Sequence, residues 1–137
     1  MASYLLIANP ASGNGRACHR ADLLANSLRD SCQVEVVETK CRGSAAEIVA
    51  DRRSDVDRVI AVGGDGTLNE ILSGLMARGL SSKARPALGF LPSGTGNAAS
   101  RAFGFGSDPI LVARSLPTAP VRPVDVGVVT HAGGERP

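Results

Sequence analysis

Short apolar runs alternate along the chain with segments in which apolar residues recur at helical spacing. The runs are rich in aliphatic and β-branched residues, which favours buried strands, and they span Tyr4–Ala8, Val34–Val37, Val59–Val62 and Ala87–Leu91. The segments with helical spacing predict helices over 17–29, 44–53, 67–78, 97–103 and 109–115. Strands that alternate with helices are typical of βαβ units, so the pattern predicts a three-layer α/β domain with a mostly parallel sheet.

Two of the predicted helices have a recognisable first turn. The sequence SAAE from Ser44 to Glu47 is typical of a capping box, in which the serine caps the helix and the glutamate bonds back to it. Asp108 followed by Pro109 offers a capping side chain and then a proline at the first helical position. Both helices are therefore expected to begin at these positions.

Towards its C-terminal end the amino-acid composition of the chain changes. Residues 117–123 read PTAPVRP, which is typical of a linker, and the alternating apolar residues of Val124–Val129 predict a strand followed by a turn at Gly133–Gly134. One strand cannot form a domain, so we expect a domain over 1–118 and, over 119–137, a linker and the first strand of a second domain in a longer protein. An exposed apolar edge strand also invites pairing with a second copy, which would give a homodimer.

A chain of 137 residues is long enough to bury a sizeable core in one domain. Its 15 basic and 13 acidic residues give a formal net charge of +2, and neither sign forms a long run. Aromatic residues are scarce, with three phenylalanines, one tyrosine and no tryptophan, so few side chains could stack on bases. We therefore expect no nucleic acid among the partners of this chain.

The cysteines and the apolar runs bear on the cellular compartment. Cys18, Cys32 and Cys41 are odd in number and form no CxxC pair, so neither a disulfide framework nor a zinc site is predicted. No apolar run approaches the roughly 20 residues that span a bilayer, and the N-terminus lacks the basic segment of a signal peptide. These features favour a cytoplasmic protein.

Three glycine-rich turns each follow a predicted strand and precede a predicted helix. They read NPASGNGRA from Asn9, GGDGT from Gly63 and LPSGTGNAAS from Leu91. Because the carboxyl ends of parallel strands meet at one edge of a sheet, the turns are expected to lie together where α/β folds bind ligands. Glycine lets backbone N–H groups approach a phosphate, and helix N-termini favour an anion there. The sequence therefore predicts a phosphate-binding edge.

The side chains of these turns add further candidates. Hydroxyls that could donate to phosphate oxygens occur at Ser12, Thr67, Ser93 and Thr95. Arg16 could reach a phosphate from the first turn of its helix, or be a solvated surface arginine. GNGRAC and GDGTLN supply only the first two glycines of GxGxxG, and no GxxxxGK[ST] is present, so neither a dinucleotide fingerprint nor a P-loop is met.

The three turns together carry a family resemblance. The segments NPASGNGRA, GGDGTLNEIL and LGFLPSGTGNAASRAFG, in this order, resemble the catalytic-domain motifs of diacylglycerol kinases, sphingosine kinases and bacterial lipid kinases. The resemblance runs from Tyr4 to about Val129, and the pair Asn69-Glu70 is similar to the lipid-kinase branch rather than to NAD kinases. It implies an N-terminal α/β domain with most of the nucleotide contacts and a C-terminal β-sandwich that forms much of the acceptor site.

The resemblance also implies a reaction and its cofactors. The enzyme would transfer the γ-phosphoryl group of ATP, with Mg²⁺, to a lipid hydroxyl such as that of diacylglycerol or a sphingoid base at a membrane surface. The glycines expected against the nucleotide are Gly13, Gly63, Gly64, Gly66 and Gly94. The side chains expected to bind it or lie near it are Asn9, Ser12, Arg16, Thr39, Thr67, Glu70 and Thr95. The metal ligands stay unassigned.

Asp65 is the candidate catalytic residue. A carboxylate between glycines would repel phosphates, so a cation is expected nearby to offset this repulsion. Mg²⁺ is such a cation, and a carboxylate can also accept the proton of the acceptor hydroxyl. The alternative is that Asp65 serves the geometry of the turn or caps the helix that follows.

One position departs from the family pattern. The family commonly carries Asp after the asparagine of the third turn, whereas Asn97 is followed here by Ala98. Two other functions stay open. One is an NAD kinase-like enzyme, whose acceptor would be a soluble nucleotide. The other is a nucleotide-binding regulatory module without catalysis, which the missing carboxylate favours.

Overall fold

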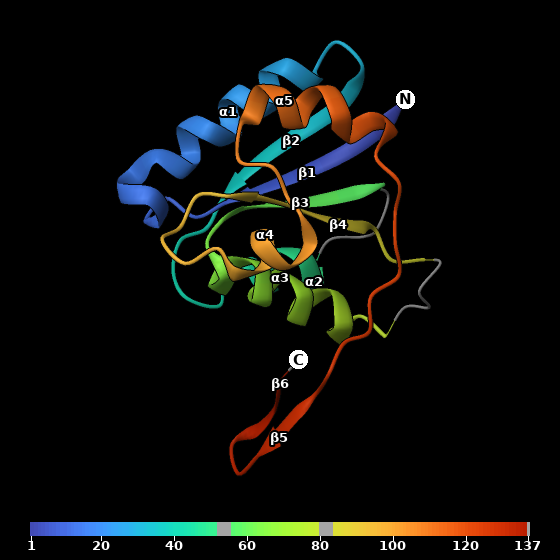
Figure 1. Cartoon of the computed structure of the whole chain (residues 1–137). Helices are drawn as coiled ribbons and strands as arrows, with labels where there is room; N and C mark the ends of the chain where they lie inside the picture. Colours follow the sequence, from blue (N-terminus) through green and yellow to red (C-terminus); the bar gives the residue numbers. More distant parts are fainter. Residues whose placement is uncertain (52–55, 80–83, 137) are drawn as a thin grey trace.

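The computed structural model describes residues 1–51, 56–79 and 84–136. Four parallel strands form its main sheet in the order β2-β1-β3-β4 (Figure 1). They are β1 (Ala2–Ala8), β2 (Cys32–Glu38), β3 (Arg58–Gly63) and β4 (Ala87–Pro92). Each contains one of the predicted apolar runs and extends at most two residues beyond either end, so the predicted parallel sheet is confirmed.

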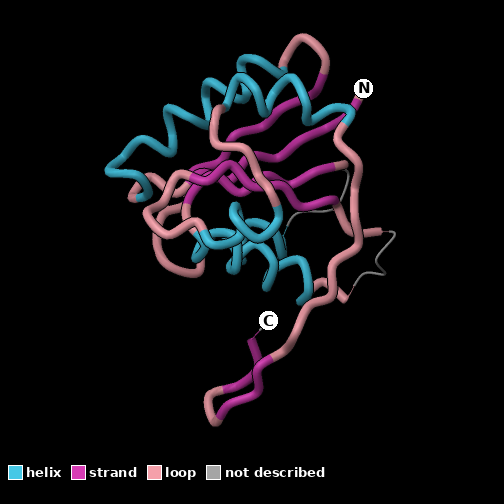
Figure 2. The backbone as a smooth tube through the Cα atoms, in the orientation of Figure 1, coloured by secondary structure: helices cyan, strands magenta, loops and turns pink. Residues whose placement is uncertain are grey.

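Helices cover both faces of this sheet, which confirms the three-layer α/β fold (Figures 1 and 2). On β1, Leu6 and Ala8 pack on the face that carries α1 and α5, and Leu5 and Ile7 pack on the face that carries α2, α3 and α4. A strand buried on both faces needs a continuous apolar run, which explains the run at β1. The helices span Arg16–Leu28 (α1), Ser44–Asp51 (α2), Asp65–Ala77 (α3), Ala98–Phe103 (α4) and Pro109–Ser115 (α5).

The helices begin and end close to the predicted positions. α5 has the predicted bounds, and Asp108 caps it by accepting two backbone N–H bonds in its first turn. α1 is preceded by a short 3-10 helix, η1 (Ser12–Gly15), and α3 begins at Asp65, two residues before the predicted start. The last two residues of the predicted helix 44–53 lie outside the described residues. Within the described ranges, every helix is too short or too polar to cross a membrane.

The register of the strands brings three strand ends to one edge of the sheet. Ala8 of β1 pairs with Val62 of β3, and Gly63 of β3 pairs with Pro92 of β4. All pairings in this sheet are parallel, so the chain leaves each strand on the same side. The three glycine turns therefore start at nearly the same level, side by side.

The C-terminal segment leaves the three layers after the short 3-10 helix η2 (Leu116–Thr118) and ends in a small hairpin (Figure 2). Near its start, Nη2 of Arg58 donates to the carbonyl oxygen of Ala119 (2.9 Å) and ties the segment to β3. The antiparallel hairpin pairs β5 (Val129–His131) with β6 (Gly134–Arg136).

The strand predicted over Val124–Val129 is wrong in its bounds. Pairing begins only at Val129, and the turn is Ala132–Gly133 rather than Gly133–Gly134. A strand needs a partner for its backbone N–H and C=O groups. Among the described residues, the partner formed in this segment is only three residues long, so the alternating valines before it stay without a ladder.

Candidate functional site

The three glycine turns meet at the carboxyl edge of the sheet, as the sequence predicts. A Cβ atom built on Gly94 would lie 2.7 Å from Cα of Gly64, so the second and third turns touch backbone to backbone. A Cβ atom on Gly13 would collide with the carbonyl oxygen of Ser93, so the first turn rests on the third. Any side chain at these positions would push the turns apart, and glycine is therefore required for their convergence.

The first turn has a left-handed backbone and a polar anchor. Residues 13–15 have φ values of 62°, 54° and 85°. The side-chain oxygen of Asn9 accepts from the N–H of Ala11 (3.0 Å), and Nδ2 of Asn9 donates to Oγ1 of Thr67 (3.4 Å). Asn9 therefore joins the first turn to the second, whatever contact it makes with a nucleotide.

Asp65 begins α3, but its carboxylate caps a different helix. Its two oxygens accept from the N–H groups of Ala98 (2.8 Å) and Ala99 (3.1 Å), the first two residues of α4. The bond from Ala99, then that from Ala98 and a smaller effect of Arg101, hold the pKa of Asp65 below its ordinary value. Asp65 is therefore ionised at neutral pH and ties the second turn to the third. The alternative that it caps the helix that follows is wrong, because its partner is α4.

The third turn is held from two sides. Asn97 has a φ of 48°, and its side chain pairs with Gly94: Oδ1 accepts from the N–H (3.2 Å) and Nδ2 donates to the carbonyl oxygen (2.8 Å). From the other side, Nε of Arg20 in α1 donates to Oγ of Ser93 (2.9 Å). Ser93 is buried and Thr95 is exposed. The turn therefore exposes Thr95 on a backbone that is fixed at both ends.

Glu70 also caps a helix other than its own. Its Oε1 accepts from the N–H of Gly43 (3.0 Å) and its Oε2 from that of Ala45 (3.3 Å), at the start of α2. The hydroxyl of Ser44 accepts from the N–H of Lys40 (3.1 Å) instead of capping α2. The capping box predicted from the sequence SAAE is therefore wrong, and a carboxylate from α3 takes its place.

A cavity of about 370 Å³ lies beside the first and second turns. Five of the predicted nucleotide contacts line it: Asn9, Thr39, Gly66, Thr67 and Glu70. The other predicted positions lie outside its lining, at or next to the junction of the three turns: Ser12, Gly13, Arg16, Gly63, Gly64, Asp65, Gly94 and Thr95. The candidate site therefore consists of a cavity and an adjoining junction.

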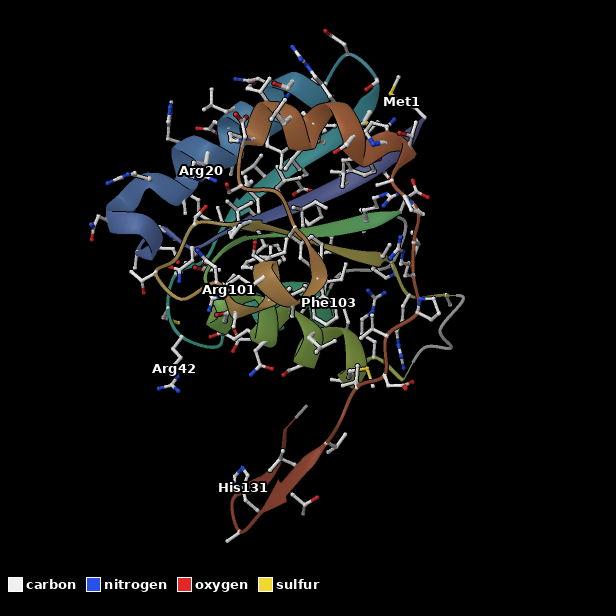
Figure 3. All side chains as sticks on the ribbon, viewed as in Figure 1. Met1, Arg20, Arg42, Arg101, Phe103 and His131 are labelled. Atoms are coloured by element: carbon white, nitrogen blue, oxygen red, sulfur yellow. The ribbon has the colours of Figure 1, made fainter. Side chains whose placement is uncertain are left out.

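Five further residues line this cavity and were not selected from the sequence: Pro10, Ala11, Lys40, Cys41 and Arg42. Three of them belong to the loop between β2 and α2, which follows a strand at the same edge as the glycine turns. Lys40 and Arg42 give that side of the cavity positive charge, and Figure 3 shows the side chain of Arg42 extending into solvent. The sequence signal that could have identified this loop is its position directly after a strand. It was not selected because it lacks a cluster of glycines.

A comparison with known proteins identifies the family. The diacylglycerol kinase catalytic domain matches residues 3–129. The chain belongs to this family. It is 34% identical to a diacylglycerol kinase of Bacillus subtilis, over 96% of the chain and 45% of that protein. It is 32% identical to sphingoid long-chain bases kinase 1 of Arabidopsis thaliana, over 94% of the chain and 18% of that protein.

Solved structures of the diacylglycerol kinase family agree with the fold. A crystal structure of a diacylglycerol kinase from Bacillus anthracis superposes with a TM-score of 0.76 at 29% identity. That match covers 98% of the chain and 47% of the Bacillus anthracis protein. The chain thus spans less than half the length of each of these relatives.

The departure at Ala98 lies inside the motifs shared with the diacylglycerol kinase family. Ala98 keeps the backbone contact, because its N–H donates to Asp65 (2.8 Å). What is missing is the side-chain carboxylate at this position. The junction of the second and third turns therefore stays joined, without the carboxylate that the resemblance led us to expect at this position.

Proposed function

We propose that this chain is the nucleotide-binding domain of an ATP-dependent lipid kinase. Residues 1–118 bind ATP, and residues 119–137 lead into a second domain, a β-sandwich that forms much of the acceptor site. The convergence of the three glycine turns at one edge of the sheet carries this proposal. Two relatives that are longer than this chain and are named as kinases support it.

ATP fits the candidate site in two parts. A cavity of about 370 Å³ is within the range of small-molecule sites and takes the nucleoside. The phosphates lie over the junction of the turns, where backbone N–H groups and the start of α3 favour an anion. Lys40 and Arg42 on the cavity wall add positive charge that attracts the nucleotide.

The acceptor in this proposal is a lipid hydroxyl, such as that of diacylglycerol or a sphingoid base. The names of the relatives, a diacylglycerol kinase and a sphingoid long-chain bases kinase, support this substrate class. An enzyme with a lipid substrate and ATP as its donor works at the cytoplasmic surface of a membrane, as a peripheral protein. Membrane contact belongs to the second domain, which also forms the acceptor site.

Mg²⁺ fits the oxygen donors around Asp65 as a shared ion. Among the described residues, no group of three or more histidine, cysteine, aspartate or glutamate side chains could hold a metal ion alone. Mg²⁺ in kinase sites is bound by one or two carboxylates together with phosphate oxygens and water. Each oxygen of Asp65 accepts one N–H bond and keeps acceptor capacity beyond it. When bound, the ion would offset the negative charge of the phosphates.

Asp65 serves in this proposal as a fixed negative charge that orients the acceptor hydroxyl. Its lowered pKa makes it a weak base at neutral pH. Phosphoryl transfer through a loose transition state depends mainly on positioning and on charge, so a strong base is not required. The two N–H bonds from α4 hold the carboxylate in one orientation, which suits a positioning role.

The test of this function is a transfer assay with three acceptors. The natural full-length protein is incubated with γ-labelled ATP and Mg²⁺ together with diacylglycerol, a sphingoid base or NAD. We expect label in one lipid product and none in NAD. Label in NAD alone would replace the proposal with an NAD kinase-like function.

A nucleotide-binding regulatory module is the second candidate, and Ala98 favours it because one carboxylate of the family pattern is missing. Calorimetric titration of the same protein with ATP separates the two functions. Binding of ATP without transfer to any acceptor would support the module. Transfer to a lipid would exclude it.

We also propose that the C-terminal segment can associate with a second copy of the chain. Its large apolar side chains are exposed at Val121 (64%), Val124 (58%), Val128 (54%) and Val129 (64%). Burying them between two copies removes apolar surface from water. Sedimentation of the 137-residue chain should give a homodimer, and the double variant Val124→Lys/Val128→Lys should sediment as a monomer. A monomeric parent chain would refute this association.

A further inference from the structure

Arg20 is a cation of α1 whose guanidinium donates to three neutral acceptors, at the end of β4 and in the loop before α5. Its Nε donates to Oγ of Ser93 (2.9 Å), and its Nη2 donates to the carbonyl oxygens of Pro92 (3.2 Å) and Ser107. Hydroxyl and carbonyl groups accept hydrogen bonds without neutralising a charge, so the guanidinium keeps its full positive charge. The sequence did not single out this residue.

These bonds fix the third turn to the helix that follows the first turn. Ser93 is only 8% exposed, and its carbonyl oxygen lies against Gly13 of the first turn. The next residue, Gly94, touches Gly64 of the second turn. Because α1 begins where the first turn ends, the side chain of Arg20 joins the first and third turns. The second turn is held by the hydrogen bonds of Asn9 and Asp65.

The charge of Arg20 matters as well as its geometry. Arg16 and Arg20 are four residues apart on α1 and therefore lie on the same side of the helix. Arg16 is exposed at the first residue of α1, whereas Arg20 is half-buried one turn further in. A partly buried charge is screened less by water and salt than an exposed one. An anion bound at the turns would therefore be attracted by Arg20, which bonds the residue that precedes Gly94.

We propose that Arg20 is a positioning residue for the phosphates of the nucleotide. It holds the first and third glycine turns at a fixed separation and supplies positive charge next to Ser93, at the start of the third turn. This inference rests on the proposed function, since it requires that the turns bind phosphate. It gives Arg20 a contribution to ATP affinity although Arg20 does not line the cavity.

A purely structural contribution of Arg20 leads to a different result. A residue that only stabilises the fold changes the number of molecules able to bind, and leaves the affinity of the folded molecules unchanged. Calorimetric titration with ATP reports the stoichiometry and the dissociation constant separately. Arg20→Lys keeps the charge but loses the planar fork of donors, and Arg20→Met loses both.

The experiment uses the natural full-length protein and three variants, Arg20→Lys, Arg20→Met and Ser93→Ala, titrated with ATP well below the Tm of each. Arg29→Met is the matched control, because Arg29 is an exposed arginine at the opposite end of α1. We expect the Kd for ATP to rise about tenfold in Arg20→Met and about threefold in the other two variants, as expected for lost hydrogen bonds to a charged group. The stoichiometry should stay constant, and the control should match the parent.

Several results would overturn this inference. One is an unchanged Kd in Arg20→Met, and another is a stoichiometry that falls while the Kd stays constant. An equal rise of the Kd for ATP in Arg29→Met would mean that the effect comes from the net charge of the protein and not from the position of Arg20. If Arg20→Met does not fold, unchanged Kd values in both Arg20→Lys and Ser93→Ala overturn it. If the parent binds no ATP, the proposed function itself fails, and the inference fails with it.

Discussion

Two features of Asp65 are compatible both with capping α4 and with a role in catalysis. Its carboxylate accepts two N–H bonds at the start of α4, and its pKa lies below the ordinary value. A capping carboxylate needs both features, and so does an ionised carboxylate that faces phosphates. Removing the charge while keeping the shape of the side chain distinguishes the two roles.

We predict that Asp65→Asn lowers the turnover of the full-length protein at saturating ATP and Mg²⁺ by about 10²-fold, the loss expected when a group that orients a reactant is removed. The Tm should fall by only a few degrees, because the amide keeps one acceptor but turns an NH₂ group towards an N–H donor. Steady-state kinetics and thermal melting measure the two effects. Turnover within a few-fold of the parent would remove Asp65 from the catalytic residues.

Asp108→Asn is the matched control for this substitution. Asp108 caps α5 and does not line the cavity, and asparagine is as good an N-cap as aspartate. Both turnover and Tm of Asp108→Asn should therefore stay close to those of the parent. A comparable loss of turnover in the control would mean that the assay reports stability.

Glu70 anchors the start of α2 and the loop beside the cavity. Glu70→Gln replaces one of the oxygens that accept the N–H bonds of Gly43 and Ala45 by an NH₂ group. Loss of a cap costs about 1 kcal/mol, and the loop that carries Lys40 and Arg42 loses its anchor. We expect a lower Tm and a several-fold weaker Kd for ATP, measured by melting and calorimetry.

The control for Glu70→Gln is Glu47→Gln. Glu47 is an exposed glutamate in the first turn of α2, so this variant removes the same charge near the same helix. If the two variants have the same Tm and the same Kd, Glu70 does not act through the start of α2.

Gly74 sets the distance between the helices α2 and α3. It is buried in the middle of α3, and a Cβ atom built on it would lie 2.5 Å from the carbonyl oxygen of Ala46 in α2. The neighbouring atom belongs to the backbone and cannot rotate away. The two helices can therefore pack at this distance only while residue 74 has no side chain.

We predict that Gly74→Ala destabilises the protein, although alanine in an exposed helix is favoured over glycine by about 1 kcal/mol. The clash with Ala46 forces α2 and α3 apart and loosens the core between them. Asn69→Ala, at an exposed position of the same helix, should keep or raise the Tm. Urea unfolding of both variants measures the effect, and a more stable Gly74→Ala would contradict the close packing of these helices.

Across the described residues, two carboxyl groups with lowered pKa values make stability depend on acid. The pKa of Asp57 is lowered by the N–H and then the hydroxyl of Ser3, and that of Asp65 by the N–H groups of Ala99 and Ala98. Between each lowered pKa and the ordinary value of about 3.9, the unfolded chain binds more protons than the folded one. The free energy of unfolding should therefore be level above about pH 5 and fall as the pH drops below it.

Urea unfolding between about pH 2.5 and pH 7 tests this expectation, with Asp57→Asn/Asp65→Asn as the variant. The loss of stability in acid should be shallower in the double variant, because neither position titrates. Asp51→Asn is the matched control, since Asp51 is exposed at the end of α2. If the free energy of unfolding falls equally steeply at low pH in the parent and the double variant, other carboxyl groups cause the loss of stability.

Local sequence patterns were sufficient to predict the four strands of the main sheet, the helices and the order of the glycine turns. These features depend on residues within a few positions of each other, such as the apolar run of β1 or the Asp108-Pro109 start of α5. The parallel register then follows from the alternation of strands and helices, and it brings the three turns to one edge. The fold and the junction of the candidate site could therefore be predicted.

Contacts between residues far apart in the sequence became visible only in the folded molecule. Asp65 bonds α4 at a separation of 33 residues, Glu70 bonds Gly43 at 27 and Arg20 bonds Ser93 at 73. Periodicity and local capping patterns cannot report such contacts, because they depend on how whole helices pack on the sheet. For the same reason the cavity wall at 40–42 was missed: a short polar loop becomes a wall only when the first glycine turn and α3 lie around the same cavity.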